Sequence, residues 1–485
     1  MKPHSSFNLT LIQKAIRLLY DHHGSNSTST GKNRAASLIV SGVGSTSLAW
    51  LFGVPGASSY LMDAHIPYGM SAVNELLFDH PVLDATQEIK YVSEEVALRM
   101  SSKAFAKSAH ISFFSRYPHS CKNDDTSMSE CNAVLQNYAS CLSNAIGLGC
   151  TGAIRTLQPK KGKHHAFIAI KCFENGKFVN KTYSIELEKD KREREEEENL
   201  ISLLIIRTLL NHSLPDHIKV EENTKSILNE LDQYFNNLLL ENEIVQNKEW
   251  SEENVWNFES DSSLIGLYSY SRNLNNEETI YELGHEEAQL FLKEKYLNFI
   301  LFPGSFNPLH HGHIQLMERA KKIALSQLSD VEKRIGLEAF FELSVQNVDK
   351  KGIDVNILRE RLEGMKKVSD RFSCLITKAP LFIQKAKLFN KDSKIFIVIG
   401  SDTAIRIVDT KYYKNSEEEM IKALMVFKQH NCVFLVGGRL DQKDKTSQKF
   451  ITMSDINVPK GFEDIFIEIP EFRVDISSTE LRNKK

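Results

Sequence analysis

The chain has 485 residues, of which 41% are hydrophobic and 25% charged, a composition typical of a folded protein with more than one domain. Its 60 Lys and Arg against 63 Asp and Glu leave a formal net charge of -3, which argues against broad binding of nucleic acid or anionic membranes. No apolar stretch reaches the roughly 18 to 20 residues that span a bilayer, and the start lacks a signal-peptide profile. We therefore expect no membrane partner and a cytoplasmic or nuclear location.

The cysteines form no recognisable framework. There are seven, an odd number, and no two have C-x-x-C spacing. This pattern argues against a set of disulfides and against a cysteine zinc site of the usual spacing. The sequence therefore predicts reduced thiols and no protein-held metal.

Residues 1–212 mix apolar runs with Gly and Ser turns, which predicts one α/β domain. Residues 36–40 and 167–170 are short, partly β-branched runs of buried-strand length. Ser93 precedes apolar residues at helical spacing, which predicts an amphipathic helix with an N-cap serine. The charged run 186–198 continues in phase into leucines, so we interpret it as the solvated face of a helix.

Residues 213–292 are richer in Asn, Glu and Ser, and only 227–240 shows helical periodicity, so we expect a helical connecting segment. The pattern changes in residues 293–485, where helical stretches separate predicted strands at 298–302, 341–345, 372–377, 394–399 and 432–436. This alternation predicts βαβ units and a mostly parallel sheet. The expected fold class is α/β, with two α/β domains.

The strongest chemical signal is the segment 302–313, FPGSFNPLHHGH, between a predicted strand and a predicted helix. A strand that turns sharply into a helix presents unpaired N–H groups and the positive end of the helix dipole, which favour an anion. Gly304 allows the backbone to approach a phosphate, while His310 and His313 can donate hydrogen bonds to phosphate oxygens. The alternative is a Gly/Pro turn with surface histidines.

A second candidate segment, ISSTELR, occupies residues 476–482. Ser477 and Glu480 have capping-box spacing, which predicts another helix N-terminus. The N–H groups of that terminus, its hydroxyls and Arg482 suit a polyphosphate. Because a capping box alone is common, this segment indicates a phosphate site only in combination with the histidine motif.

Together the two segments resemble the nucleotidylyltransferase superfamily of the H-x-G-H and I-S-S-T-x-x-R type, and GSFNP with its two histidines is most similar to nicotinamide mononucleotide adenylyltransferases. The resemblance implies a Rossmann-like fold of the nucleotidylyltransferase type in residues 293–485. It implies catalytic roles for His310, His313 and Arg482. It also implies nucleotide binding by Gly304, Ser305, Phe306, Gly400, Asp402, Ser478 and Thr479.

The implied substrates are ATP and a phosphorylated acceptor, with Mg²⁺ as the helping ion. The acceptor phosphate is already ionised near neutral pH, so the protein has to align two anions and neutralise developing charge. Lys350, after the predicted strand 341–345, can share that work, although a loop lysine is usually solvated. Family members often place tryptophans near the pyridine ring, whereas this chain has Lys411-Tyr412-Tyr413, which leaves the acceptor open.

In the N-terminal domain, GVPGAS at 53–58 and VSEEVA at 92–97 resemble the CinA C-terminal domain family. That family implies hydrolysis of the amide of nicotinamide mononucleotide by a serine, which corresponds to Ser41. Here Val40 and Val73 replace the family's glutamate and lysine. Because a serine needs an adjacent base, we expect a domain without hydrolysis that serves as a scaffold, regulatory site or dimer contact. An active deamidase is the alternative.

Both resemblances involve the same pyridine mononucleotide, which favours that compound as the acceptor. We therefore expect adenylyl transfer from ATP to nicotinamide or nicotinate mononucleotide, giving NAD or deamido-NAD and pyrophosphate. Three alternatives stay open: cytidylyl transfer, a phosphopantetheine-type acceptor, and nucleotide sensing without turnover. The expected partners are small-molecule substrates and no nucleic acid, and a homo-oligomer stays open.

Overall fold

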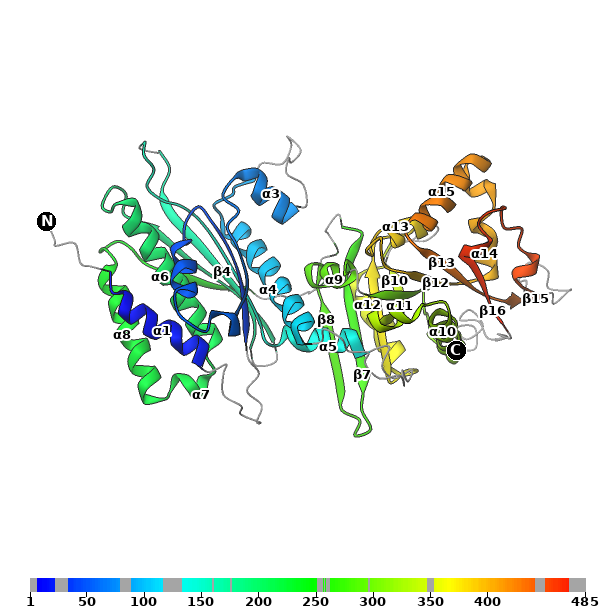
Figure 1. Ribbon diagram of the computed structural model, residues 1–485, viewed down its shortest axis with the longest axis horizontal. Helices are drawn as coiled ribbons and strands as arrows, with labels where there is room; N and C mark the ends of the chain where they lie inside the picture. The colour runs from blue at the N-terminus through cyan, green and yellow to red at the C-terminus, as the bar shows by residue number, and fades with distance from the viewer. Residues whose placement is uncertain are drawn as a thin grey trace. The chain divides into compact units, whose positions relative to one another are not determined.

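The computed structural model describes residues 7–21, 34–78, 89–116, 133–158, 161–174, 177–250, 256, 258, 262–294, 297–346, 353–440 and 450–470. The chain divides into unit 1, residues 1–116 and 138–253, and unit 2, residues 117–137 and 254–485. Each unit contains a sheet flanked by helices (Figure 1), which confirms the predicted α/β class. Among the described residues, no helix combines the length and apolar character needed to cross a membrane.

Unit 1 is built on a six-stranded sheet in the order β2-β1-β3-β4-β5-β6. Its strands are β1 (Ala35–Ser41), β2 (Leu61–His65), β3 (Ala145–Ala153), β4 (His164–Glu174), β5 (Lys177–Leu187) and β6 (Gln246–Trp250). β1 pairs in parallel with β2 and β3, and every later neighbour in this sheet is antiparallel. The predicted strand 36–40 is the buried centre of β1, and the predicted strand 167–170 lies within β4, where residues 168–170 are buried.

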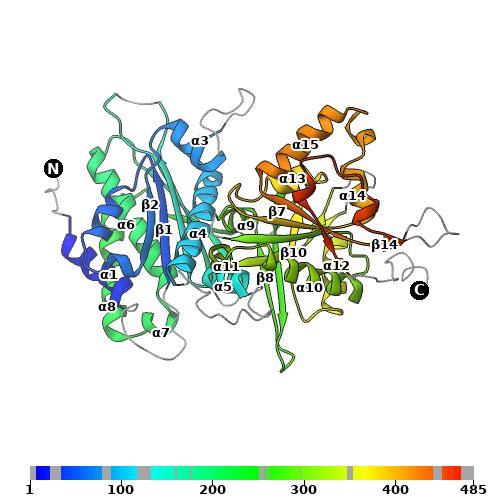
Figure 2. The ribbon, with the colours of Figure 1, turned by 45° about the vertical axis from the view of Figure 1, so that its right-hand side comes forward.

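Helices cover both faces of this sheet (Figure 2). One face packs against α1 (Leu9–Asp21), α2 (Thr46–Phe52), α6 (Arg194–Ser213) and α8 (Glu222–Leu238). The other face packs against α3 (Met70–Phe78) and α4 (Glu94–Arg116). The remaining elements between residues 34 and 219 are η1 (Ala57–Ser59), α5 (Ala133–Leu142) and α7 (Asp216–Lys219).

The helix predicted after Ser93 is α4, and the Val96 N–H donates to Ser93 Oγ at 3.3 Å, as expected of an N-cap. α4 lies unusually close to β3 because two glycines face it. A Cβ built on Gly147 would lie 2.1 Å from the Phe105 backbone nitrogen, and one on Gly149 would lie 2.3 Å from the Ala97 carbonyl oxygen. Any side chain at either glycine would therefore push α4 off the sheet.

The charged run 186–198 is not the single solvated helix face that we predicted. Its first residues end β5, and α6 begins only at Arg194. Glu197 is fully buried, and its Oε1 lies 2.7 Å from Nδ1 of His164. The run of alternating charges does not show that Glu197 is buried, because its partner, His164, lies 33 residues earlier in the sequence.

Unit 2 contains an eight-stranded sheet in the order β16-β13-β12-β9-β10-β11-β7-β8. Its strands are β7 (Leu264–Arg272), β8 (Glu278–Leu283), β9 (Asn298–Pro303), β10 (Leu337–Ser344), β11 (Arg371–Thr377), β12 (Ile395–Gly400), β13 (Cys432–Gly437) and β16 (Phe466–Ile469). From β16 to β11 all neighbours are parallel, which is the doubly wound Rossmann-like order. All five strands predicted in this part of the chain are confirmed.

The connections of unit 2 are mainly helical. They comprise α9 (His285–Leu292), α10 (His311–Ser326), α11 (Asp330–Ile335), α12 (Val355–Lys366), α13 (Phe382–Ala386), α14 (Ser401–Ile407), η2 (Thr410–Tyr413), α15 (Glu417–Gln429), η3 (Met453–Asp455) and η4 (Glu463–Ile465). β14 (Arg439–Leu440) and β15 (Phe450–Ile451) form a separate two-stranded ladder. Aromatic rings fill the sheet face, where Phe299 stacks on Phe340 at 6.2 Å between centroids.

Residues 213–292, which we predicted to form one helical connecting segment, divide between the two units. α8 corresponds to the helix predicted at 227–240 and belongs with β6 to unit 1. β7, β8 and α9 belong to unit 2, where β7 pairs antiparallel with β11. Local periodicity could not show this, because the partner strand of β7 follows about a hundred residues later.

Glu338 of β10 is a buried carboxyl group inside unit 2. The Leu135 backbone N–H donates to its Oε1 at 2.9 Å, while Oε2 has no hydrogen-bond partner among the described residues. Burial raises the pKa of Glu338 to about 8, despite the opposing effect of the backbone hydrogen bond. The folded protein therefore holds this group as the neutral acid at pH 7.

We expect Glu338→Gln to raise the melting temperature at pH 8 and to change it little at pH 5. The wild-type carboxyl ionises near pH 4.5 when unfolded and near pH 8 when folded, so stability falls as pH rises between these values. The free energy of unfolding falls by at most about 1.4 kcal/mol per pH unit. The glutamine variant does not show this fall, because glutamine does not ionise. Thermal unfolding of both proteins across this range is the measurement. The exposed Glu360→Gln serves as control, and an equal shift at both pH values would contradict the prediction.

Candidate functional site

The carboxyl ends of β9, β10, β12 and β13 lie at one edge of the unit 2 sheet, because these strands are parallel. The chain proceeds from β9 to β10 on one side and later adds β12 on the other side of β9. Ligands of open α/β sheets bind where the strand order reverses in this way. Ile397 of β12 pairs with Leu301 of β9, so the two strands end close together, at Gly400 and Pro303.

The turn after β9 is formed by the predicted motif. The Gly304 N–H donates to the Glu342 carbonyl at 3.0 Å, which holds the turn against β10. Phe306 has a φ of 41°, and its buried ring covers Gly304 closely enough that a Cβ there would lie 2.6 Å from Phe306 Cζ. Gly304 is thus required by packing, a reason that we did not predict. Ser305 is exposed at the same turn.

His310 and His313 come together at the N-terminus of α10. His310 is the N-cap residue, and its backbone N–H donates to Nδ1 of His313 at 3.3 Å. The two ring centroids are 3.7 Å apart. Phe302 and Phe306 pack edge-on against the His313 ring at 5.9 and 5.2 Å. The His313 imidazole is therefore held by aromatic neighbours on the strand and the turn.

The electrostatics of this pair favour a neutral His310. Burial, and secondarily the neighbouring His311, lower the pKa of His310 below its ordinary value. Its Nδ1 atom is buried and has no hydrogen-bond partner in the described part of the chain. A neutral imidazole with an unpartnered ring nitrogen can form one hydrogen bond with a ligand.

Gly400 and Asp402 lie at the neighbouring strand end. Gly400 is the N-cap of α14, and Asp402 lies half-buried in its first turn. Between them Ser401 is fully buried, and its Oγ has no partner within the described ranges. We did not predict a role for Ser401, although it lies between Gly400 and Asp402, two of the residues predicted to bind nucleotide.

The structure therefore brings Gly304, Ser305, Phe306, His310, His313, Gly400 and Asp402 to the same edge of one sheet. Lys350, Ser478, Thr479 and Arg482 lie outside the described residues. Their roles stay predictions.

In unit 1, Ser41 ends β1 and is nearly buried. Its Oγ donates to the Pro67 carbonyl at 2.8 Å, an acceptor that cannot take a proton. Val40 and Val73, which replace the family's ionisable residues, are buried in the core. Among the described residues, the Ser41 hydroxyl therefore bonds to a carbonyl and not to the adjacent base that nucleophilic attack requires.

A carboxylate from the same unit lies at the N-terminus of α2, directly after Ser41. Glu198 accepts hydrogen bonds from the Gly44 N–H at 3.1 Å and the Thr46 N–H at 2.9 Å. The Ser45 hydroxyl also donates to it, at 3.0 Å. Sequence analysis missed this contact because Glu198 follows the turn by about 150 residues. An internal anion therefore occupies the place where a ligand anion would lie.

Residues 301–484 match the family model described as cytidylyltransferase-like. No curated protein matches the chain. The similar solved structures include the competence/damage inducible protein CihA from Agrobacterium tumefaciens, at 15% identity and a TM-score of 0.28 over 44% of this chain and 100% of that one. They also include CinA superfamily proteins from Klebsiella pneumoniae (10%, TM-score 0.26, 42% and 97% covered) and Escherichia coli (13%, TM-score 0.25, 44% and 93% covered).

The family match spans the turn after β9, α10 and all later strands of the parallel sheet. It therefore covers the described edge at which the two histidines and Asp402 lie. By this match, residues 301–484 are similar to cytidylyltransferase-like domains of the nucleotidylyltransferase superfamily, and their described parallel strands form a Rossmann-like sheet.

Proposed function

We propose that this protein transfers the adenylyl group of ATP to nicotinamide or nicotinate mononucleotide, giving NAD or deamido-NAD and pyrophosphate. Nucleotidyl transfer is the coarser activity supported by the cytidylyltransferase-like domain. The observation that carries the proposal is the position of His310 and His313 at a helix N-terminus beside the point where the strand order reverses.

In the proposed reaction, an oxygen of the acceptor phosphate attacks the α-phosphorus of ATP in line, and the bond from that phosphorus to pyrophosphate breaks. No protein nucleophile is required, so catalysis consists of alignment and charge neutralisation. The N–H groups at the start of α10 and the ring nitrogens of His310 and His313 would donate to phosphate oxygens. His310, half-buried at the N-cap of α10, lies where such a donor is needed.

Mg²⁺ would neutralise charge on the triphosphate. This ion is commonly held by substrate phosphates together with one or two carboxylates. Asp402, half-buried at the start of α14, is a carboxylate at this edge of the sheet and fits as such a ligand or as a nucleotide contact.

The choice of a pyridine acceptor rests on the paired sequence resemblances. Tyr412 adds one structural feature, because its ring is exposed on η2, shortly after α14. An exposed aromatic ring can stack on a flat heterocycle such as pyridine. The neighbouring Tyr413 is anchored instead, since its hydroxyl donates to the Ile407 carbonyl at 2.9 Å.

We infer that unit 1 does not hydrolyse the mononucleotide. Ser41 donates to a carbonyl rather than to a base, and Glu198 occupies the adjoining helix terminus. A scaffold, a regulatory site or a contact between copies of the chain is then its proposed role.

The test is to incubate the purified full chain with ATP or CTP, Mg²⁺ and a panel of phosphorylated acceptors while pyrophosphate and ammonia are measured. Pyrophosphate release with ATP and a pyridine mononucleotide alone would support the proposal. Pyrophosphate release only with CTP or with another acceptor would support nucleotidyl transfer between other substrates. ATP binding without pyrophosphate release would support nucleotide sensing. Ammonia release that disappears in Ser41→Ala would overturn the inference about unit 1.

A further inference from the structure

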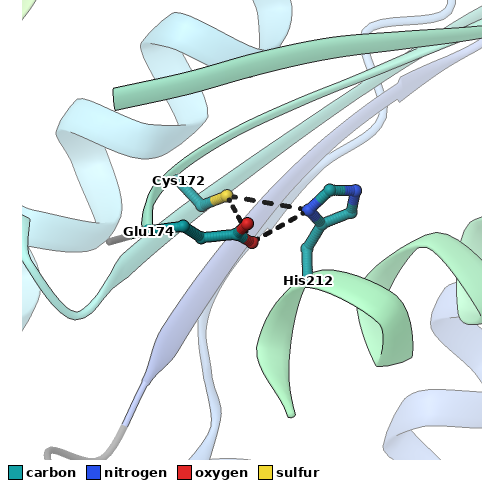
Figure 3. Close-up of side chains that lie close together, drawn as sticks. All are labelled: Cys172, Glu174 and His212. Atoms are coloured by element: carbon teal, nitrogen blue, oxygen red, sulfur yellow. Dashed lines mark hydrogen bonds and ion pairs between the residues drawn. The ribbon is translucent and has the colours of Figure 1, made fainter. Parts of the chain in front are cut away.

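Cys172, Glu174 and His212 converge in unit 1 (Figure 3). The strand registers place them at the end of the sheet opposite to Ser41. Cys172 and Glu174 are two residues apart on β4, so both side chains point to the same face of the strand. His212 reaches them from the last turn of α6. Within the described residues, this is the only group of three or more His, Cys, Asp or Glu side chains close enough to share a metal ion.

The spacing of the three donor atoms fits one cation. Cys172 Sγ lies 3.3 Å from Glu174 Oε1 and 3.9 Å from His212 Nδ1, and Nδ1 lies 3.0 Å from Oε1. Around tetrahedral zinc, ordinary bond lengths place sulfur, nitrogen and oxygen ligands about 3.3 to 3.6 Å apart. The observed distances bracket that interval, so only small side-chain shifts would place all three atoms on one ion.

The geometry differs from that of a nucleophilic triad. In a triad the imidazole uses one nitrogen for the nucleophile and the other for the carboxylate. Here the thiol and the carboxylate both approach Nδ1 of His212, while Nε2 lies 2.8 Å from the Tyr183 hydroxyl. A histidine that ligates a metal commonly has its second nitrogen held by such an outer partner. Tyr183 therefore orients His212 as a ligand through Nδ1.

The charges of the two acidic ligands would balance those of a divalent cation. Burial raises the pKa of the Cys172 thiol. Although burial opposes it, the hydrogen bond with His212 lowers the pKa of Glu174. A thiolate and a carboxylate would together neutralise a doubly charged ion in this nearly buried place.

Arg34 carries a positive charge close to the cluster, and this charge disfavours the binding of a cation. Its guanidinium donates to the backbone carbonyls of His212 at 2.7 Å and of Phe173 at 3.2 Å. The Arg34 guanidinium also lies within hydrogen-bond reach of the Cys172 thiol. Its charge lowers the pKa of the Cys172 thiol, which favours the thiolate form that a metal requires.

We propose that Cys172, Glu174 and His212 bind a divalent cation of the zinc class, in a site that ties β4 to α6 and is independent of the nucleotidyl-transfer edge. Three protein ligands leave a fourth position for water or another small ligand. Tyr183, the outer partner of His212, also lines a cavity of about 370 Å³ between β5, α6 and α8. Cys-x-Glu followed by a histidine 38 residues later is not a common zinc spacing, which is why sequence analysis predicted no metal.

The test is a titration of the chelator-treated full chain with Co²⁺, followed by Zn²⁺. We expect one Co²⁺ per chain, with thiolate-to-cobalt absorption that Zn²⁺ abolishes by displacement, and a higher melting temperature with Zn²⁺. Cys172→Ala or His212→Ala should weaken binding by at least about 100-fold, and Tyr183→Phe by about 10-fold, the scale of losing an outer partner.

Cys150→Ala is the matched control, because it removes another fully buried thiol of the same unit and should retain wild-type binding. Circular dichroism checks folding, and Glu174→Gln, which preserves shape, provides a second variant if Cys172→Ala does not fold. The proposal is overturned by wild-type protein that shows no thiolate-to-cobalt band. It is equally overturned by a band that persists in both the Cys172 and His212 variants.

Discussion

We expect His313→Ala to lower the rate of pyrophosphate release by about 10² to 10³ at saturating substrates, the usual scale for losing one donor to transition-state charge. The His313 ring lies at the N-terminus of α10, and its Nδ1 accepts the His310 backbone N–H. Its other ring nitrogen is the atom that we propose to donate to the triphosphate. Steady-state kinetics at pH 7 to 8 provide the measurement.

His311→Ala is the control for this variant. His311 lies two residues before His313 in the same helical turn and is exposed, so its loss should change the rate little. The melting temperatures of both variants show whether the turn remains folded. A wild-type rate in His313→Ala would remove the proposed role of this histidine.

The second large effect is expected on stability. Glu342 of β10 and Lys385 of α13 form a nearly buried ion pair at 2.6 Å, with side-chain exposures of 1% and 5%. Lys385 also donates to the Ala379 carbonyl at 2.6 Å, and the Thr377 hydroxyl donates to Glu342. We expect Lys385→Met to destabilise unit 2 by about 3 to 5 kcal/mol, because it leaves the Glu342 carboxylate buried without its cation. Urea unfolding measures the change.

Two further variants test whether the unpaired Glu342 carboxylate causes the loss of stability. Lys387→Met removes an exposed lysine two residues away and should cost less than about 0.5 kcal/mol. Glu342→Gln combined with Lys385→Met should recover much of the loss, because no unpaired charge then remains. A loss below about 1 kcal/mol in Lys385→Met would show that the carboxylate does not need this partner. Since the Glu342 carbonyl accepts the Gly304 N–H, Lys385→Met should also slow nucleotidyl transfer.

Local patterns were reliable where the chain alternates short apolar runs with helical stretches. The five strands predicted from residue 298 onward are all present, and together they predicted a parallel sheet. The turn that contains Gly304 and the two histidines was equally predictable, since a strand end, a glycine and a helix start follow one another in the sequence. Alternation cannot give strand order, however, and the order is what brings Gly400 beside the turn at Gly304.

Patterns failed where an element is defined by distant partners. β7, which we placed in a connecting segment, is buried along most of its length and pairs with β11 and β8. Glu197 belongs to a charged run but is buried beside His164. A glutamate is compatible with a surface position, and only its partner makes the burial of Glu197 favourable.

The amino-acid sequence contains the strand and helix periods, the turn residues and the types of side chain that can bind phosphate, because each depends on neighbours a few residues away. The folded chain alone determines which charged and nucleophilic groups share a site. Glu198 at the α2 terminus, Lys385 on Glu342, and His212 beside Cys172 are each joined to partners 40 to about 150 residues away. Such contacts form only when packing of the sheets and helices has stabilised the ordered chain, so no local pattern predicts them.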